Sequence, residues 1–223
     1  IMHVKLISYS QPVGESMTLT EMVAFCARVS NPANQHNTAT SSKLIRYLQE
    51  HKHWSPFEMV SICVEIETTR DISRQILRHR SFSFQEFSQR YAVTDALTTA
   101  TSGSSSSTAT IREARLQDKT NRQSSLSADS DTSLCEEWRE RQERIAADAA
   151  ETYKWALDHG IAKEQARVVL PEGMTPTRMY MHGTLRSWLH YFQVRTDPGT
   201  QKEHREIAEA IQALFTAELG INI

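Results

Sequence analysis

The residues with the clearest capacity for chemistry lie in one short stretch, 78–90, which reads Arg-His-Arg-Ser-Phe-Ser-Phe-Gln-Glu-Phe-Ser-Gln-Arg. A guanidinium stays charged at physiological pH and offers a planar fork of donors that matches a phosphate. Arg78, Arg80 and Arg90 repel one another unless an anion lies between them, and Glu86 is the only carboxylate in the stretch. The interleaved phenylalanines favour a formed cavity, so the pattern predicts a phosphate-bearing ligand. A solvated basic helix face is the alternative interpretation.

Other candidate residues each have a structural alternative. Arg167 adjoins an apolar run, where a buried salt bridge would also account for a charged residue. Arg195 ends a helical segment, where a positive charge would also interact favourably with the helix dipole. Ser88 has the look of a nucleophile, but no histidine or lysine is placed to activate it, so we expect hydrogen bonding instead. His51 and His53 would be half of a metal site, and without a partner at suitable spacing we predict no metal.

Composition limits the classes of function. The chain has 223 residues, 39% of them hydrophobic and 23% charged, with a net charge of -2, which argues against a general nucleic-acid or membrane-surface binder. No apolar run approaches the ~20 residues of a membrane helix. Without a signal-peptide pattern, we expect a cytoplasmic protein, in the cytosol of a bacterium or of a host cell if the chain is virus-encoded. Cys26, Cys63 and Cys135 lie far apart and form no metal or redox spacing.

The elements that must position these side chains mix strands with helices. Apolar and polar residues alternate over 59–67, which predicts a half-buried antiparallel strand. Ser/Thr-x-x-Glu capping boxes at Thr18, Ser133 and Thr200 predict three helix starts, and Asp71 is expected to cap a fourth.

We therefore predict one compact α+β domain, 1–223, in which an antiparallel sheet packs with long helices. A Ser/Thr/Ala-rich segment suggests a flexible insert at 94–132. The long helix at 133–159 is expected to bury one face, formed by Trp138, Ile145, Ala149, Tyr153 and Ala156. The remaining expected elements are a strand at 4–9 and helices at 18–30, 41–51, 71–78, 183–195 and 200–219.

The stretch also resembles a known signature. Arg78-His-Arg80, seven residues, Ser88 and then Arg90-Tyr91 resemble the motif of the flavin-dependent thymidylate synthases, the thymidylate synthase complementing protein family. Further blocks follow the order of that family on both sides of the motif. They are Ala27–Ser30, His53–Glu58 and Arg74-Gln75 before it, and Ala166–Pro171 and Arg186 to Arg195 after it.

The resemblance implies a homotetramer with active sites between subunits. It also implies a reaction, the methylation of dUMP to dTMP, with 5,10-methylenetetrahydrofolate as carbon donor and NADPH as reductant through FAD. No cysteine lies near the arginine-rich stretch, so a thiolate attacking the uracil ring is not expected. In the family, the arginine that matches Arg195 activates the ring electrostatically.

Carried over position by position, the resemblance implies a catalytic residue, Arg195, and no metal ligand. The dUMP contacts would be Gln75, Arg78, Glu86, Phe87, Ser88, Gln89, Arg90, Arg167 and Arg195, with Arg167 supplied by another subunit. The FAD contacts would be Ser55, Arg78, His79, Arg80, Glu86, Thr184, Arg186 and His190.

The chain departs from the family pattern at two positions. Gln85 stands where asparagine is common and Thr184 where asparagine is usual, and both changes bear on FAD affinity more than on the reaction. Two other functions stay open. A single-strand nucleic-acid module would use the same arginines with the phenylalanines as stacking platforms, although the net charge of -2 disfavours it. A flavoprotein that has lost folate chemistry is the other.

Overall fold

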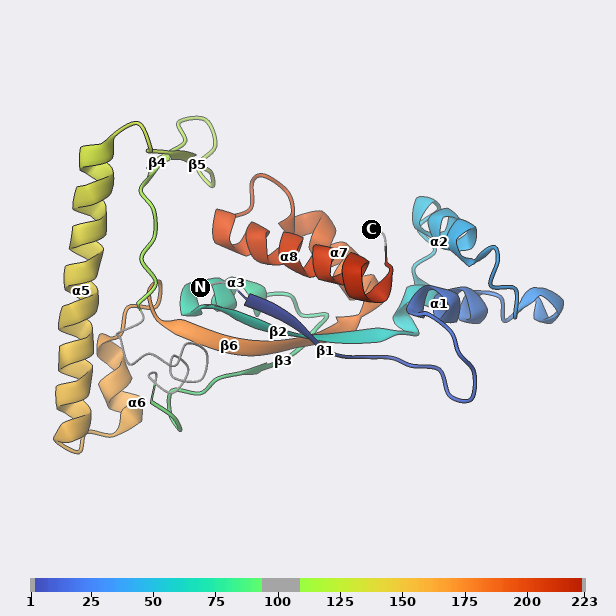
Figure 1. Ribbon diagram of the computed structural model, residues 1–223, viewed down its shortest axis with the longest axis horizontal. Coiled ribbons are helices and arrows are strands. Elements are labelled where there is room, and N and C mark those ends of the chain that lie inside the picture. The colour runs from blue at the N-terminus through green and yellow to red at the C-terminus, as the bar shows by residue number, and fades with distance from the viewer. Residues whose placement is uncertain (1–2, 94–108, 222–223) are drawn as a thin grey trace.

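The computed structural model describes residues 3–93 and 109–221, and a four-stranded antiparallel sheet forms its centre (Figure 1). The strand order is β1-β2-β6-β3. The bounds are His3–Tyr9 for β1, Ser61–Thr69 for β2, Ser83–Glu86 for β3 and Pro176–Thr184 for β6. The predicted combination of an antiparallel sheet with helices is confirmed.

The two faces of the sheet differ in chemistry as the alternation of β2 predicts. Ile62, Val64 and Ile66 are fully buried and belong to the main core. The opposite face is charged, and Arg178 of β6 donates to Glu67 of β2 through Nε at 2.9 Å. Because these charges pair across neighbouring strands, both faces of the sheet keep the strands in register.

Two helices cover the apolar face of the sheet, α7 (Leu185–Arg195) and α8 (Lys202–Leu219) (Figure 1). The rings of Trp188, Phe192 and Phe215 are almost completely buried beneath them, and the Trp188 indole donates to the Ile62 carbonyl at 3.2 Å. The short helix α3 (Arg70–Ile76) follows β2 directly and packs against α8. This layer carries four of the predicted site residues, Gln75 on α3 and Arg186, His190 and Arg195 on α7.

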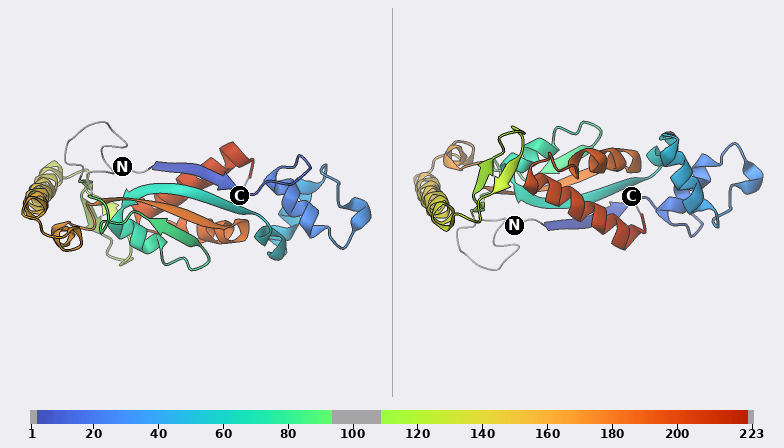
Figure 2. Two further views of the ribbon diagram at one scale, coloured as in Figure 1. Left: turned by 90° about the horizontal axis from the view of Figure 1, so that it is seen from below. Right: turned by 90° about the horizontal axis from the view of Figure 1, so that it is seen from above.

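The remaining elements lie at the two ends of an elongated molecule (Figures 1 and 2). One end holds α1 (Leu19–Ala27), α2 (Ser41–Glu50) and the 3-10 turns Pro32–Asn34 and Ser55–Glu58. The other end holds the hairpin β4 (Arg115–Gln117) and β5 (Ser125–Ser127), the long helix α5 (Thr132–Asp158), α6 (Lys163–Ala166) and the 3-10 turn Arg167–Val169. The capping box between Thr18 and Glu21 is confirmed.

The long helix differs from its prediction in two respects. Its N-cap is Asp131, whose carboxylate accepts from the Leu134 amide at 3.0 Å, so the capping box expected at Ser133 is wrong. The predicted buried face is also wrong in part, because Trp138 is 42% and Ile145 50% exposed. In the C-terminal half of α5, Tyr153 and Ala156 pack against α6, and in its N-terminal half Gln142 is buried and bonds the Arg112 backbone.

Two other predicted helix starts are wrong. Thr69, not Asp71, is the N-cap of α3, and Asp71 accepts from the Thr69 hydroxyl at 2.6 Å. The last helix begins one residue later than predicted, with Gln201 as the N-cap of α8, and the Thr200 hydroxyl donates to the Val194 carbonyl at 3.2 Å. Of the expected flexible insert, 94–108 lie outside the described residues, and the described remainder contains the β4–β5 hairpin, which the sequence did not indicate.

Candidate functional site

The arginine–histidine motif, Arg78-His79-Arg80, lies in the turn between α3 and β3. The His79 amide donates to the Ile76 carbonyl at 3.0 Å, and the Phe82 amide donates to the His79 carbonyl at 3.3 Å. The Phe82 ring is buried against Trp188, with 4.8 Å between ring centroids, and anchors the turn. The stretch is therefore a turn and not the basic helix of the alternative interpretation, and Phe82 is buried in it. The cavity expected around the arginines stays a prediction.

The two arginines of the motif point away from this anchor. Arg78 and Arg80 are exposed, whereas His79 between them is half-buried. No hydrogen bond or ion pair holds either guanidinium in the part of the chain that the structure describes. The protein itself thus leaves these two positive charges unbalanced, as the sequence predicts.

Arg195 lies at the C-terminus of α7 and contacts the same turn. Its Nε donates to Nε2 of His79 at 2.8 Å, so that imidazole nitrogen accepts and the ring is neutral. Burial, followed by the charges of Arg195 and His190, lowers the pKa of His79 to about 4. Within the described ranges neither Nη group of Arg195 has a hydrogen-bond partner, so both remain available to a ligand.

A buried polar chain that the sequence did not indicate lies behind this pair. His204 is fully buried; its Nε2 lies 3.1 Å from the Tyr191 hydroxyl and its Nδ1 lies 3.3 Å from Oε1 of Gln75. Burial, then the charges of Arg195 and His79, lowers the pKa of His204 to about 3, and burial raises the pKa of Tyr191. The one available signal was the position of His204 three residues before Ile207 on the buried face of α8.

The start of α7 gathers a second set of predicted contacts. Thr184 is the N-cap, and its hydroxyl accepts from the Ser187 amide at 3.3 Å. Arg186 pairs with Glu58 of the 3-10 turn at 2.6 Å, and both side chains are nearly half exposed. Ser55 lies in that same turn, and His190 is exposed one turn after Arg186. The predicted flavin contacts therefore come from α7, the 3-10 turn and the arginine–histidine turn.

Glu86 has a different environment from the one expected for a ligand contact. Its carboxylate accepts from Ser73 at 2.8 Å, Thr177 at 3.0 Å and Arg74 at 3.1 Å, and Arg70 lies 4.0 Å away. These contacts tie β3 to α3 and β6, so in this chain Glu86 holds the scaffold of the site together.

The expected phosphate contacts form a separate group. Arg90 lies 3.8 Å from the Glu164 carboxylate, and Arg167 donates to the Glu164 carbonyl at 3.3 Å. The salt bridge considered for Arg167 does not form within the described residues. Phe87 and Ser88 are half-buried and Gln89 is buried in the segment before Arg90. Among the described residues, no hydrogen bond or ion pair joins Arg90 or Arg167 to His79 or Arg195.

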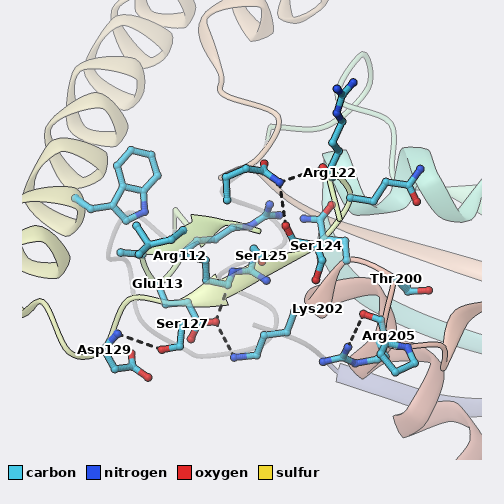
Figure 3. Close-up of a pocket in the computed structure, with 18 of the residues that line it drawn as sticks. Arg112, Glu113, Arg122, Ser124, Ser125, Ser127, Asp129, Thr200, Lys202 and Arg205 are labelled. Carbon is cyan, nitrogen blue, oxygen red and sulfur yellow. Dashed lines mark hydrogen bonds and ion pairs between the residues drawn. The ribbon is translucent and has the colours of Figure 1, made fainter. Parts of the chain in front are cut away.

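A well-formed pocket of the described chain does not contain these residues. It has a volume of about 740 Å³ and lies between the β4–β5 hairpin, the start of α5 and the start of α8 (Figure 3). Its cations are largely compensated, since Lys202 pairs with Glu113 at 2.7 Å and Arg112 pairs with Asp71 at 2.8 Å. Gln201 lines this pocket and connects it to the buried polar chain, because its Oε1 accepts a hydrogen bond from Gln75.

The described residues give little support for a metal site, for cysteine chemistry or for a membrane-spanning helix. They contain no group of three or more side chains suited to hold a metal ion, and His51 instead stacks on Tyr47 at 4.0 Å between ring centroids. Cys26, Cys63 and Cys135 are unpaired and half-buried, and burial raises the pKa of Cys63. No described helix is both long and apolar enough to cross a membrane.

A comparison with solved structures identifies the class of fold. The UMP/dUMP methylase PolB from Streptomyces cacaoi, bound with 5-Br dUMP, has a TM-score of 0.75 at 26% sequence identity, covering 97% of this chain and 90% of that chain. The same methylase bound with 5-Br UMP has a TM-score of 0.76 at the same identity. The chain thus has the α+β fold of a nucleotide methylase, with an arginine–histidine cluster at one edge of the sheet.

Sequence comparison gives the family. The model described as thymidylate synthase complementing protein matches residues 13–219. The probable flavin-dependent thymidylate synthase of Paramecium bursaria Chlorella virus 1 is 46% identical over 220 residues, covering 97% of this chain and 95% of its own length. The flavin-dependent thymidylate synthase of Synechocystis sp. is 46% identical over 218 residues, covering 96% and 94%. The chain belongs to the thymidylate synthase complementing protein family, and it is an enzyme of the flavin-dependent thymidylate synthase type.

Proposed function

We propose that this enzyme methylates dUMP to dTMP, with 5,10-methylenetetrahydrofolate as carbon donor, FAD as cofactor and NADPH as reductant. In this reaction C5 of the uracil releases its proton and receives the methylene unit. Two electrons that originate from NADPH reduce that unit to a methyl group. The observation that carries the proposal is the contact between Arg195 and a neutral His79, beside two arginines that have no hydrogen-bond or ion-pair partner among the described residues.

The residues present fit a flavin dinucleotide. Arg78 and Arg80 offer exposed guanidinium groups, unpaired within residues 3–93 and 109–221, which match the charge and geometry of a pyrophosphate. Ser55, Thr184, Arg186 and His190 would complete the site from α7 and the neighbouring 3-10 turn. When bound, FAD would supply the chemistry of hydride transfer.

Arg195 would activate the uracil ring. A cation held against the carbonyl edge of the ring stabilises the ring anion, which makes C5 nucleophilic without a covalent bond to the enzyme. His79 supports this role because it accepts from Nε of Arg195, orients the guanidinium and adds no competing positive charge. The raised pKa of Cys63 is consistent with a mechanism that uses no thiolate.

The substrate phosphate would be bound by residues from two chains. Within one chain, Arg90 and Arg167 cluster at Glu164, apart from His79 and Arg195. A homotetramer with active sites between subunits would bring the Arg90 group of one subunit to the Arg195 group of another. Gln75, Ser88 and Gln89 would then surround the nucleotide.

The test is a direct assay of the product. Purified protein is loaded with FAD, reduced anaerobically with NADPH, and mixed with dUMP and 5,10-methylenetetrahydrofolate. The proposal predicts dTMP and oxidised flavin in equal amounts. FAD-loaded protein that oxidises NADPH but forms no dTMP would favour a flavoprotein without folate chemistry, and protein that takes up no FAD would refute the proposal.

A further inference from the structure

The buried polar chain behind Arg195 is continuous over five side chains. The Tyr191 hydroxyl lies 3.1 Å from Nε2 of His204, and Nδ1 of His204 lies 3.3 Å from Oε1 of Gln75. Nε2 of Gln75 lies 2.7 Å from Oε1 of Gln201, whose own Nε2 lies 2.9 Å from Oε2 of Glu203. Tyr191 and His204 are both fully buried, so water does not substitute for a missing partner.

The carboxylate at one end fixes the direction of every bond. Glu203 contacts the guanidinium of Arg115 and lies 4.0 Å from that of Arg112, and as a carboxylate it only accepts. Gln201 must therefore turn its NH₂ group toward Glu203 and its oxygen toward Gln75.

The same reasoning continues to the other end. Gln75 must donate to Gln201 with its NH₂ group, which places its oxygen toward His204. His204 must then carry its proton on Nδ1, and its Nε2 accepts from the Tyr191 hydroxyl. This assignment agrees with a neutral His204 and a protonated Tyr191. If the Gln75 amide were reversed, its oxygen would face the oxygen of Gln201. If the Gln201 amide were reversed as well, its oxygen would face the carboxylate of Glu203.

We propose that this chain fixes the Gln75 amide so that it selects uracil over cytosine, which makes His204 a positioning residue for pyrimidine specificity. The inference rests on the proposed function, in which Gln75 contacts the nucleotide. After its two internal bonds, the amide keeps one N–H and one oxygen lone pair for a ligand.

Uracil and cytosine present opposite patterns to such an amide. Uracil offers a carbonyl oxygen at C4 and an N–H at N3, which suit the free N–H and the free lone pair of Gln75. In the same pose, cytosine places an NH₂ group against the amide N–H and an unprotonated N3 against the amide oxygen. A freely rotating glutamine would turn its amide over to match cytosine. The hydrogen bonds that run from Glu203 fix which way the Gln75 amide faces, and turning it over would leave buried polar groups unpaired, so Gln75 rejects cytosine.

The experiment compares dissociation constants of dUMP and dCMP on the FAD-loaded protein, followed by the change in flavin absorbance. His204→Phe keeps a buried ring but removes the donor to Gln75, and it should lower the preference for dUMP by about tenfold or more. His204→Asn restores a donor close to the position of Nδ1 and should keep the preference within about threefold of wild type. A general loss of packing would weaken both nucleotides equally and leave their ratio unchanged.

A second pair of variants changes residues at the partly exposed Glu203 end of the hydrogen-bonded side chains. These variants do not require the hydrophobic core to accept a new side chain. Glu203→Gln replaces the obligatory acceptor with an amide that can face either way, so the preference should fall. Arg115→Gln removes the ion pair but keeps the carboxylate, so the preference should persist. If wild type prefers dUMP and neither His204→Phe nor Glu203→Gln lowers the ratio, the inference is overturned while the proposed function stands. Wild type that binds no dUMP would refute both.

Discussion

The backbone of Gly183 lies directly against the ring of Phe82, with no room for a side chain. Gly183 lies on β6 opposite Ile62, and a Cβ added there would lie 2.5 and 2.7 Å from Cδ1 and Cε1 of Phe82. The Phe82 ring is held on its other sides by Trp188 and Tyr191, at 4.8 and 6.0 Å between centroids. A Gly183→Ala substitution must therefore displace the ring that anchors the arginine–histidine turn.

The magnitude follows from the two opposing effects of the substitution. Forcing an extra methyl into a packed core destabilises by about 1–3 kcal/mol. Alanine also restricts the unfolded chain, which by itself stabilises by about 0.4–1 kcal/mol where the backbone accepts it. Gly173→Ala is the matched control, because its Cβ would meet only Asp71 atoms at 3.9 Å or more. Because both variants gain this effect of alanine on the unfolded chain, it cancels in their comparison, and Gly183→Ala should be less stable than Gly173→Ala by about 1–3 kcal/mol.

Thermal unfolding at one protein concentration measures this difference, at about 2–4 °C in Tm for each kcal/mol in a chain of this size. Because Phe82 lies two residues after Arg80, Gly183→Ala should also weaken FAD uptake, whereas Gly173→Ala should not. Combining Gly183→Ala with Phe82→Ala should cost less than the sum of the single changes, since the clash disappears. Equal Tm values and equal FAD uptake for the two alanine variants would refute this account of the turn.

Three further predictions concern single ionisable groups. Glu86→Gln should lower the free energy of unfolding by about 1.5–3 kcal/mol, measured by urea denaturation, because one oxygen of a carboxylate surrounded by donors becomes a donor. His204 is neutral when folded, with a pKa lowered to about 3 from 6.5, so the unfolded chain binds more protons and stability falls as pH falls through 6.5. In urea titrations, the free energy of unfolding of wild type should fall by about 2 kcal/mol more than that of His204→Phe when the pH is lowered from about 7 to about 5. Arg80→Ala should change stability by less than about 0.5 kcal/mol, since Arg80 has no partner in the described chain, yet weaken FAD binding by about tenfold or more.

Periodicity predicts the core layer well because the interactions that decide it are local. The alternation of Ile62, Val64 and Ile66 places one face of β2 in the core, as observed. Leu185, Trp188, Leu189 and Phe192 fall on one stripe of α7, and all four are buried. In each case a strand or helix period fixes which side chains share a face, independently of the rest of the chain.

Capping boxes show where local reasoning fails. The three Ser/Thr-x-x-Glu patterns are equivalent in sequence, yet only Thr18–Glu21 forms both hydrogen bonds. Asp131 takes the N-cap role before Ser133, and Gln201 takes it after Thr200. A cap forms only where the helix begins, and the packing of the helix decides that position as much as the local pattern does.

The candidate site was predictable as a set of residue types but not as an arrangement. The unbalanced charge of Arg78 and Arg80 follows from the sequence. The bond from Arg195 to His79 joins residues 116 positions apart, and the bond from His204 to Gln75 joins residues 129 positions apart. Neither pair has a sequence signal, because only the packing of α3, α7 and α8 brings them together.

The release of hydrogen from C5 of dUMP tests the central claim most directly, because it reports ring activation before methyl transfer is complete. The assay compares FAD-loaded wild type, Arg195→Ala and a variant with Cys26, Cys63 and Cys135 all changed to serine, using dUMP tritiated at C5. Activation by Arg195 predicts tritium release in wild type and in the cysteine-free variant, and a loss of about 100-fold or more in Arg195→Ala that still binds FAD. Full release by Arg195→Ala together with none from the cysteine-free variant would contradict the account.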